Sequence, residues 1–397
     1  MKIDWNRKYT TIAVYAVLVV IASLICYNVL HNFIAYKAAF QQLIAILLPV
    51  IYGFSIAFVL NPVVRFFEKK ALPKISRGKL SPKWNKGIAV LLTYLAAFLV
   101  IAVFLSVVIP QVTTSLAGIV SNLSEYLVRV TAWINHLFEM LPQEKLFQET
   151  LKKISESAQA ILEAFYGWLS ASLPLVINAT KNLTTGLTNS ILGLIISIYF
   201  LFGKERFFAQ IKKALYALLP EDFVRRMVDV THTSSRIFSG FISGKLLDSL
   251  IIGILCFLGM SLLGMPMAML VSVIIGVTNI IPYFGPIIGA VPSALIVFLI
   301  DPIKALWFVI FVICLQQFDG NILGPRILGD SIGMPAFWVI FSILLFGGYF
   351  GVLGMFVGVP TFAVIYSIFK LWTERRLERK NLPTDTKSYA SKEHSLL

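Results

Sequence analysis

Long apolar runs separated by short polar segments make up most of this 397-residue chain. A helix needs about 20 apolar residues to cross roughly 30 Å of hydrocarbon. The first run follows a basic stretch but is too long for a usual cleavable signal core, so we expect it to be retained. The pattern predicts an all-α, polytopic helical membrane protein. Spans are expected at about 11–30, 43–61, 88–109, 187–203, 238–263 and 303–318.

The pattern changes after the fifth of these spans, where shorter apolar arms replace full crossings. The arms 267–281 and 286–300 are separated by Pro282, Gly285 and Pro286. Each arm rises only about 22 Å at 1.5 Å per residue, which is short of a full crossing. We therefore expect a broken, re-entrant helical hairpin that enters the bilayer and turns back.

A second pair of arms, 336–347 and 350–371, follows the last span and is broken at Gly347, Gly348 and Gly351. One crossing separates the two pairs, so the second pair should enter from the opposite face of the membrane. The longer arm of the second pair is also long enough to cross completely. Two full spans therefore remain the alternative for this pair.

Two short motifs mark this duplication. GMP occurs at 264–266 and 333–335, and YFG occurs at 283–285 and 349–351. We predict that a span plus a hairpin is repeated in inverted orientation, a plan typical of secondary transporters with midplane binding sites. Broken backbone is tolerated at that depth only where it is buried or lines a cavity, so the breaks are the expected site. Close helix packing by the glycines is the alternative.

Composition and charge agree with a membrane protein. Hydrophobic residues make up 58% of the chain and charged residues 14%, with a mean hydropathy of +0.83. In soluble domains, hydrophobic residues average roughly 45–50% of the chain and charged residues about a quarter. The net charge of +14 gathers in 62–87, 204–236 and the tail after 370. The positive-inside rule places these segments and both termini in the cytoplasm, facing anionic membrane lipid and not nucleic acid.

The segment 111–186 is then expected outside, as amphipathic helices at 112–141 and after Pro142. These helices either pack on the protein's own outer surface or form an oligomer contact, and the sequence leaves both open. The second helix carries a seam of apolar residues at alternating spacings of four and three: Phe147, Leu151, Ile154, Ala158, Ile161 and Phe165.

The chain is thus predicted to have five parts. They are N-terminal transmembrane helices with the basic loop 62–87 (1–110), extracytoplasmic helices (111–186), a span with a basic segment (187–236), the repeat core (237–372) and a cytoplasmic tail (373–397).

Polar side chains inside apolar segments are costly and are often functional. Lys245 and Asp248 lie three residues apart on one face of the fifth span. They are candidates for proton or ion coupling as a charge-compensated pair. The alternative is that Lys245 extends to the cytoplasmic surface and leaves Asp248 near the interface.

Amide and carboxylate groups near the breaks are the candidate binding groups. Asn279 either offers its carboxamide to a substrate or caps the broken helix end. A second group ends the span 303–318, where an ionised Asp319 would suit a cation and the amides would suit a polar solute. The alternative there is a solvated loop with an Asp319–Arg326 surface pair. This second group consists of Gln316, Gln317, Asp319, Asn321 and Arg326.

Three runs resemble the autoinducer-2 exporter family of bacterial membrane proteins: NIIPYFGPIIGAVPS at 279–293, QQFDGNILGPRILGDSIGMP at 316–335 and FGGYFGVLGMFVGVP at 346–360. The resemblance covers nearly the whole chain. It implies a bacterial inner or plasma membrane protein with about eight membrane elements and a homo-oligomer, for which a pentamer is one arrangement. It also implies export of autoinducer-2 in some members and sodium or lithium/proton antiport in others.

The leading hypothesis is a secondary transporter that exports a small polar solute such as autoinducer-2. Its gated midplane site would lie at the hairpin tips, Tyr283 and Tyr349, with Gly285 and Gly351 beside them. A monovalent cation/proton antiporter using Asp248 or Asp319, and a non-transporting scaffold, are the alternatives. We expect no cofactor, no metal site and no enzymatic activity. The four histidines have no metal-ligand spacing, no HExxH motif occurs, and SGFISGK at 239–245 is one residue short of a phosphate loop.

Overall fold

The structure is a computed structural model that describes residues 7–75, 81–139, 191–328 and 333–389, with scattered positions between 153 and 178. All regular structure among these residues is helical. The chain divides into two compact units. One unit is Met1–Ala57 with Asn189–Leu201, and the other is Phe58–Thr188 with Phe202–Leu397.

Six described helical stretches are long and apolar enough to cross a membrane, which confirms a polytopic helical membrane protein. Two shorter apolar helices, α10 (Ala268–Thr278) and α11 (Phe284–Ile300), accompany them. The expected span 187–203 lies partly in α8 (Ile191–Leu218), which is not among the six, while 187–190 lie outside the described residues. The six contain α1 (Arg7–His31), α2 (Phe33–Phe66), α4 (Pro82–Val103) with its continuation to Ser121, α9 (Glu221–Leu262), α12 (Pro302–Phe318) and α14 (Ala336–Glu378).

In the first unit, α2 and α8 approach closely at two glycines. A Cβ atom on Gly53 would lie 2.6 Å from Cγ2 of Ile196 and 2.8 Å from the carbonyl oxygen of Gly193. Small residues let membrane helices approach until van der Waals packing holds them together. The contact therefore depends on the missing side chain of Gly53.

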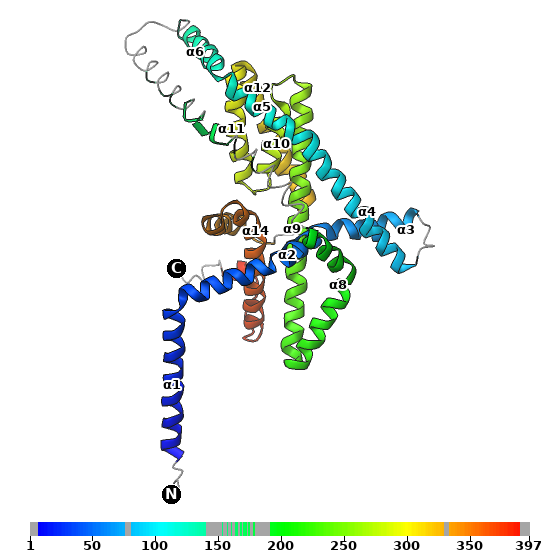
Figure 1. Ribbon diagram of the computed structural model, residues 1–397, viewed down its shortest axis with the longest axis vertical. Helices are drawn as coiled ribbons and strands as arrows, with labels where there is room; N and C mark the ends of the chain where they lie inside the picture. The colour runs from blue at the N-terminus through cyan, green and yellow to red at the C-terminus, as the bar shows by residue number, and fades with distance from the viewer. Residues whose placement is uncertain are drawn as a thin grey trace. The chain divides into compact units, whose positions relative to one another are not determined.

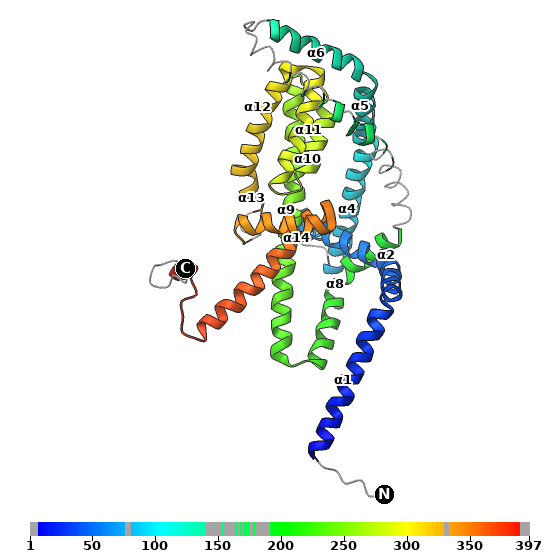
Figure 2. The ribbon, with the colours of Figure 1, turned by 90° about the vertical axis from the view of Figure 1, so that its left-hand side faces the viewer.

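In the second unit, α9 has a buried stripe along most of its length. Its N-terminal half packs through Phe241 against Val339, Ile343 and Val359 of α14. Its C-terminal half packs against α10 and α12, which lie beside it in Figures 1 and 2. The stripe recurs every three or four residues, as one helix face requires: Ile237, Phe241, Lys245, Asp248, Ile252, Cys256 and Met260.

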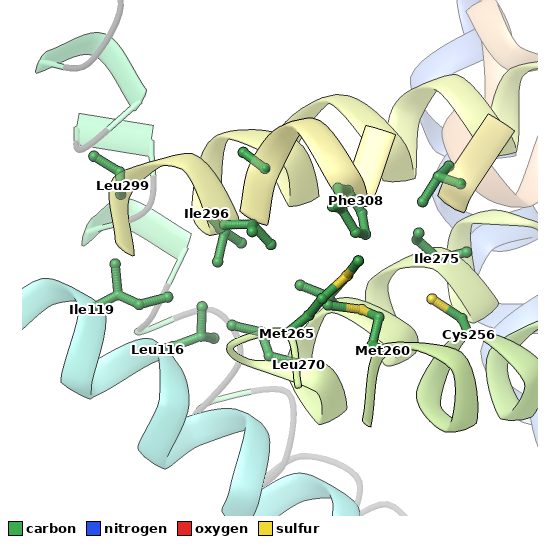
Figure 3. Packing of buried hydrophobic residues seen from close by; sticks show 14 of the residues in the cluster. Leu116, Ile119, Cys256, Met260, Met265, Leu270, Ile275, Ile296, Leu299 and Phe308 are labelled. Carbon is green, nitrogen blue, oxygen red and sulfur yellow. The ribbon is translucent and has the colours of Figure 1, made fainter. Parts of the chain in front are cut away.

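The main apolar core joins this half of α9 to α10, α11 and α12. Met260, Leu270, Ile296 and Phe308, one from each helix, are fully buried there (Figure 3). Burying side chains of this size stabilises a core by about 1.5–3 kcal/mol each in water. The same contacts align the helices that carry the polar residues described below.

The outer helices α5 (Ile109–Ser121) and α6 (Leu123–Glu139) pack on this core. Ile119 and Val130 are buried in it, and the ring of Trp133 meets that of Phe298 edge to face at 6.1 Å. The described part of the outer segment thus packs on the protein's own surface, and the oligomer contact stays a prediction. Of the predicted seam only Phe165 lies among the described residues; it is buried and stacks on Trp168.

The first pair of arms, α10 and α11, runs back along itself. A Cβ atom on Gly285 would collide with the Thr278 carbonyl oxygen, and one on Gly289 would collide with Oγ1 of Thr278. The same atom on Gly289 would lie 3.3 Å from Cα of Ile275. Glycine at these two positions lets the backbones of the arms touch.

The second break lies inside α14, at Gly351. Its φ of 61° and ψ of −146° form a conformation that essentially only glycine adopts. The neighbouring Gly347 and Gly348, which were also expected at the break, lie within the helix. Beyond Gly351 the chain turns back, since a Cβ atom on Gly354 would collide with the Phe346 carbonyl oxygen.

The duplication is therefore visible in the backbone. The glycines of both GMP motifs, Gly264 and Gly333, have a φ of 59°. Each repeat then has an arm, a residue with positive φ and a second arm whose glycines press against the first. The structural counterpart of Gly285 is Gly354 and not the Gly351 of the second YFG, so the sequence motif and the structural repeat differ by three residues.

Two basic segments that were expected on the same membrane side contact each other. Lys86 Nζ lies 2.5 Å from Oε2 of Glu205 and donates a hydrogen bond to the Phe202 carbonyl oxygen. Lys204 Nζ donates to Oδ1 of Asn61 at 2.7 Å. These contacts join the end of α2, the start of α4 and the middle of α8 within the second unit.

We predict that Gly285→Ala and Gly354→Ala each destabilise the protein by about 1–3 kcal/mol, the usual cost of overpacking. The added methyl group meets a carbonyl oxygen in each repeat. Thermal unfolding in detergent measures the effect. Gly348→Ala is the control, because no atom lies within 4 Å of its added Cβ; an equal loss in all three variants would contradict the prediction.

Candidate functional site

Two adjacent positions of the α9 stripe carry charge. Lys245 is 6% exposed and Asp248 is fully buried, and Lys245 Nζ lies 2.6 Å from Oδ2 of Asp248. Helical residues three apart lie on one face, which brings the two side chains together. Of the two arrangements left open by the sequence, the structure shows the buried pair.

Asn279 joins this pair to a second carboxylate. It follows α10 directly, is fully buried, and its Nδ2 group donates to Oδ2 of Asp248 at 3.2 Å and to Oδ2 of Asp319 at 3.3 Å. Both protons of the amide are thereby used. The first break thus places its carboxamide between α9 and the end of α12.

Asp319 owes its position to a local change in helix type. It begins the five-residue π-helical turn η3 (Asp319–Leu323), which continues α12 and leads into α13 (Gly324–Leu328). A π-turn holds more residues per turn than an α-turn and often occurs at functional sites. Asp319 is only 7% exposed, so the turn directs its carboxylate inward.

We call Lys245, Asp248, Asn279 and Asp319 the buried polar cluster. It contains two carboxylates and one ammonium group, so it carries one excess negative charge when all are ionised. Oδ1 of Asp248, Oδ1 of Asn279 and Oδ1 of Asp319 are buried and accept no hydrogen bond from the residues that the structure describes. Burying unpaired charge is costly, so the cluster is more stable when this excess charge is neutralised.

The remaining predicted residues lie apart from these contacts. Gln317 accepts a hydrogen bond from Asn321 at 2.9 Å on an exposed surface. Arg326 is exposed, and within the described residues the side chain of Asp319 accepts its hydrogen bond from Asn279. Tyr349 is 80% exposed and lies in the helix before the break.

Other buried polar atoms without a hydrogen-bond partner in the described part of the chain include three in α9, α11 and α12: Oγ of Ser249, Oγ of Ser293 and Nε2 of Gln316. Gln316 was a predicted site residue, whereas the two serines were missed. Ser249 directly follows Asp248, so a small polar residue beside a membrane charge was the available signal.

The backbone at the first hairpin tip is strained. Tyr283 has a φ of 62° and a ψ of −47°, and the Phe284 N–H donates to the Pro282 carbonyl oxygen at 2.7 Å. This is a γ-turn of the rare form with positive φ at its centre. Such conformations cost about 1–3 kcal/mol and gather at functional sites.

Broken helices around a buried charged cluster, within helices apolar enough to span a membrane, are features of a membrane transporter. The family model described as "AI-2E family transporter" matches residues 24–374. The chain belongs to the AI-2E transporter family.

Several curated relatives cover most of the chain. "Putative transport protein YueF" of Bacillus subtilis is 29% identical over 343 residues, covering 83% of this chain and 87% of the relative. "Putative transport protein YrrI" of the same species is 27% identical over 321 residues, covering 78% and 82%. "Putative transport protein YhhT" of Escherichia coli is 27% identical over 320 residues, covering 78% and 80%. These relatives support a membrane transporter and name no substrate.

We predict that Lys245→Met destabilises the protein by about 3 kcal/mol, because it leaves Asp248 buried without its cation. The double variant Lys245→Met/Asp248→Asn should recover part of this loss, because the unpaired charge is then removed. Denaturant unfolding of the single and double variants in detergent gives the coupling energy. Additive losses would show that the two side chains do not depend on each other.

We predict that Tyr283→Gly raises the free energy of unfolding by about 1 kcal/mol, because glycine adopts a positive φ without strain. Tyr283→Ala removes the same ring but keeps the Cβ atom, so it should bring no such gain. Thermal unfolding of the two variants side by side isolates the backbone effect. Equal stability of the two variants would mean that the turn holds no strain.

Proposed function

We propose that this protein is a secondary transporter that exchanges a monovalent cation, Na⁺ or Li⁺, for a proton at the buried polar cluster. The observation that carries the proposal is the cluster's composition: of two buried carboxylates only Asp248 is paired with a lysine, and three oxygens of the cluster accept no hydrogen bond from described residues. Carboxylate and amide oxygens suit hard cations. The carboxylates equally suit a proton.

The charge balance supports binding of one cation at a time. Lys245 neutralises one carboxylate, so the cluster becomes neutral when a single proton or a single Na⁺ binds. Binding of one therefore disfavours the other, because a second positive charge would be buried without a partner. Competition of this kind is what an exchanger requires.

In the proposed exchange cycle, the two hairpins are the elements that move. Asn279 lies at the first break and bonds to both carboxylates, so movement of the first hairpin would change the cluster directly. We place the repeats in inverted orientation, with the clustered basic segments 62–87 and 204–236 on the cytoplasmic side of a bacterial cell membrane. The contacts of Lys86 with Glu205 and of Lys204 with Asn61 support one side for both segments.

Export of a small polar solute such as autoinducer-2 is the second candidate. The unpartnered Nε2 donor of Gln316, one turn before Asp319, favours it, since an amide beside carboxylates can bind the hydroxyl groups of a polar solute. The same cluster would then hold the coupling proton. The two candidates therefore differ in cargo and share the carboxylates.

Proton movement in proteoliposomes under an imposed sodium gradient tests the proposal. We expect Asp319→Asn and Asp248→Asn to lower sodium-driven proton flux by about tenfold or more, which corresponds to roughly 1.4 kcal/mol of lost cation binding. Asp229→Asn, on an exposed face of the same α9 helix, is the matched control and should behave as wild type.

The outcomes separate the candidates. Sodium-driven flux that survives both cluster variants would refute exchange at this site. Absence of sodium-driven flux in the wild type, together with proton-driven movement of autoinducer-2 that fails in Asp319→Asn, would establish the second candidate.

A further inference from the structure

Each of the two carboxylates that bind the amide of Asn279 has a polar residue three positions before it on its own helix. Lys245 precedes Asp248 on α9. Gln316 precedes Asp319 where α12 ends. Residues three apart share a helix face, so each polar side chain lies on the same face as its carboxylate. The two pairs differ in charge, because only the first contains a cation.

The pair on α9 is closed. Lys245 Nζ lies 2.6 Å from Oδ2 of Asp248, and both side chains are buried. The same Oδ2 atom accepts a hydrogen bond from Asn279. Moving the ammonium group away would leave two buried charges without partners, which is costly. Asp248 therefore already has the positive charge that it needs.

The pair on α12 is open. Nε2 of Gln316 and Oδ1 of Asp319 are both buried, and neither has a hydrogen-bond partner among the described residues. Asp319 also has no ion-pair partner in the parts of the chain that the structure describes. It accepts a hydrogen bond from the neutral amide of Asn279. Of the two carboxylates, Asp319 is therefore the one that gains from an added positive charge.

The two basic residues of α12 and α13 do not take the place of a lysine at position 316. Lys304, in the first turn of α12, donates to the Gly264 carbonyl oxygen at 2.8 Å. Arg326 follows the π-turn on α13, and its side chain is exposed. The excess negative charge of the buried polar cluster therefore resides at Asp319.

We propose that Asp319 is the carboxylate that binds the exchanged cation, and that the neutral side chain of Gln316 keeps it available. Lys245 and Asp248 form the fixed pair that positions the amide of Asn279. A lysine at position 316 would neutralise the cluster and leave no charge for Na⁺ to compensate. This inference rests on the proposed function for its cargo, and it names the group that binds Na⁺ and the residue that determines this selectivity.

Thermal unfolding in detergent tests the assignment, with sodium chloride compared with choline chloride at equal ionic strength. Sodium should raise the melting temperature of the wild type by about 3 °C or more, because a bound ligand stabilises the folded state. Gln316→Lys should abolish this sodium shift and raise the melting temperature in choline, because the lysine replaces the cation. A sodium shift that survives in Gln316→Lys, or that is absent from the wild type, would overturn the proposal.

Two variants control for position and charge. Gln317→Lys adds the same charge at the neighbouring exposed position and should keep the wild-type sodium shift. The swap variant Lys245→Gln/Gln316→Lys moves the lysine from one carboxylate to the other and restores one excess negative charge. It should regain the sodium shift that Gln316→Lys lacks. Absence of the shift in a folded swap variant would contradict the role of charge at position 316.

Sodium-driven proton flux in proteoliposomes separates this inference from the proposed function. A sodium shift that Gln316→Lys abolishes, without sodium-driven flux in the wild type, would refute exchange and retain Asp319 as the cation site. Sodium-driven flux in the wild type, together with an unchanged sodium shift in Gln316→Lys, would retain exchange and overturn the assignment of Gln316.

Discussion

The carboxylate of Asp248 is the interaction on which the organisation of the second unit depends. It is fully buried and has two partners, a lysine on its own helix and an amide from the first helix break. A lone ionised carboxylate at this position would be prohibitively costly, so α9, α10 and α12 must approach in one register. Apolar packing alone tolerates small shifts between helices, whereas this cluster does not.

The two apolar clusters on α9 lie on either side of the Asp248 carboxylate. The second hairpin packs at Phe241, and the first packs from Ile252 onward, with the charged pair between them. The single helix α9 therefore packs against both hairpins, and its charged pair lies between the two contact regions. Both hairpins therefore contact α9 within a few residues of the charged pair.

The sequence revealed the helices, the duplication and all four members of the buried polar cluster, because charge and amide groups in apolar runs are conspicuous. It suggested the Lys245–Asp248 pair, but it could not show that Asn279 and Asp319 join it, since these contacts span 31 and 40 residues along the chain. The direction of Asp319 depends on a π-turn, for which no simple residue signal exists. The three-residue offset between the YFG motifs and the structural repeat arises because close glycine contacts, and not the aromatic residues, fix where each arm folds back.

The two breaks differ in one respect. The first holds a tyrosine in a backbone conformation that favours glycine, while the second uses glycine itself. A molecule with two equivalent hairpins would have no preferred resting state, since each arrangement would mirror the other in energy. Unequal strain removes this symmetry. A change in the backbone of Tyr283 would release conformational strain at the first tip, whereas Gly351 at the second tip holds little strain to release. Strain at a single residue of one tip thus biases which conformation is populated at rest, while the gradients alone set the direction of net movement.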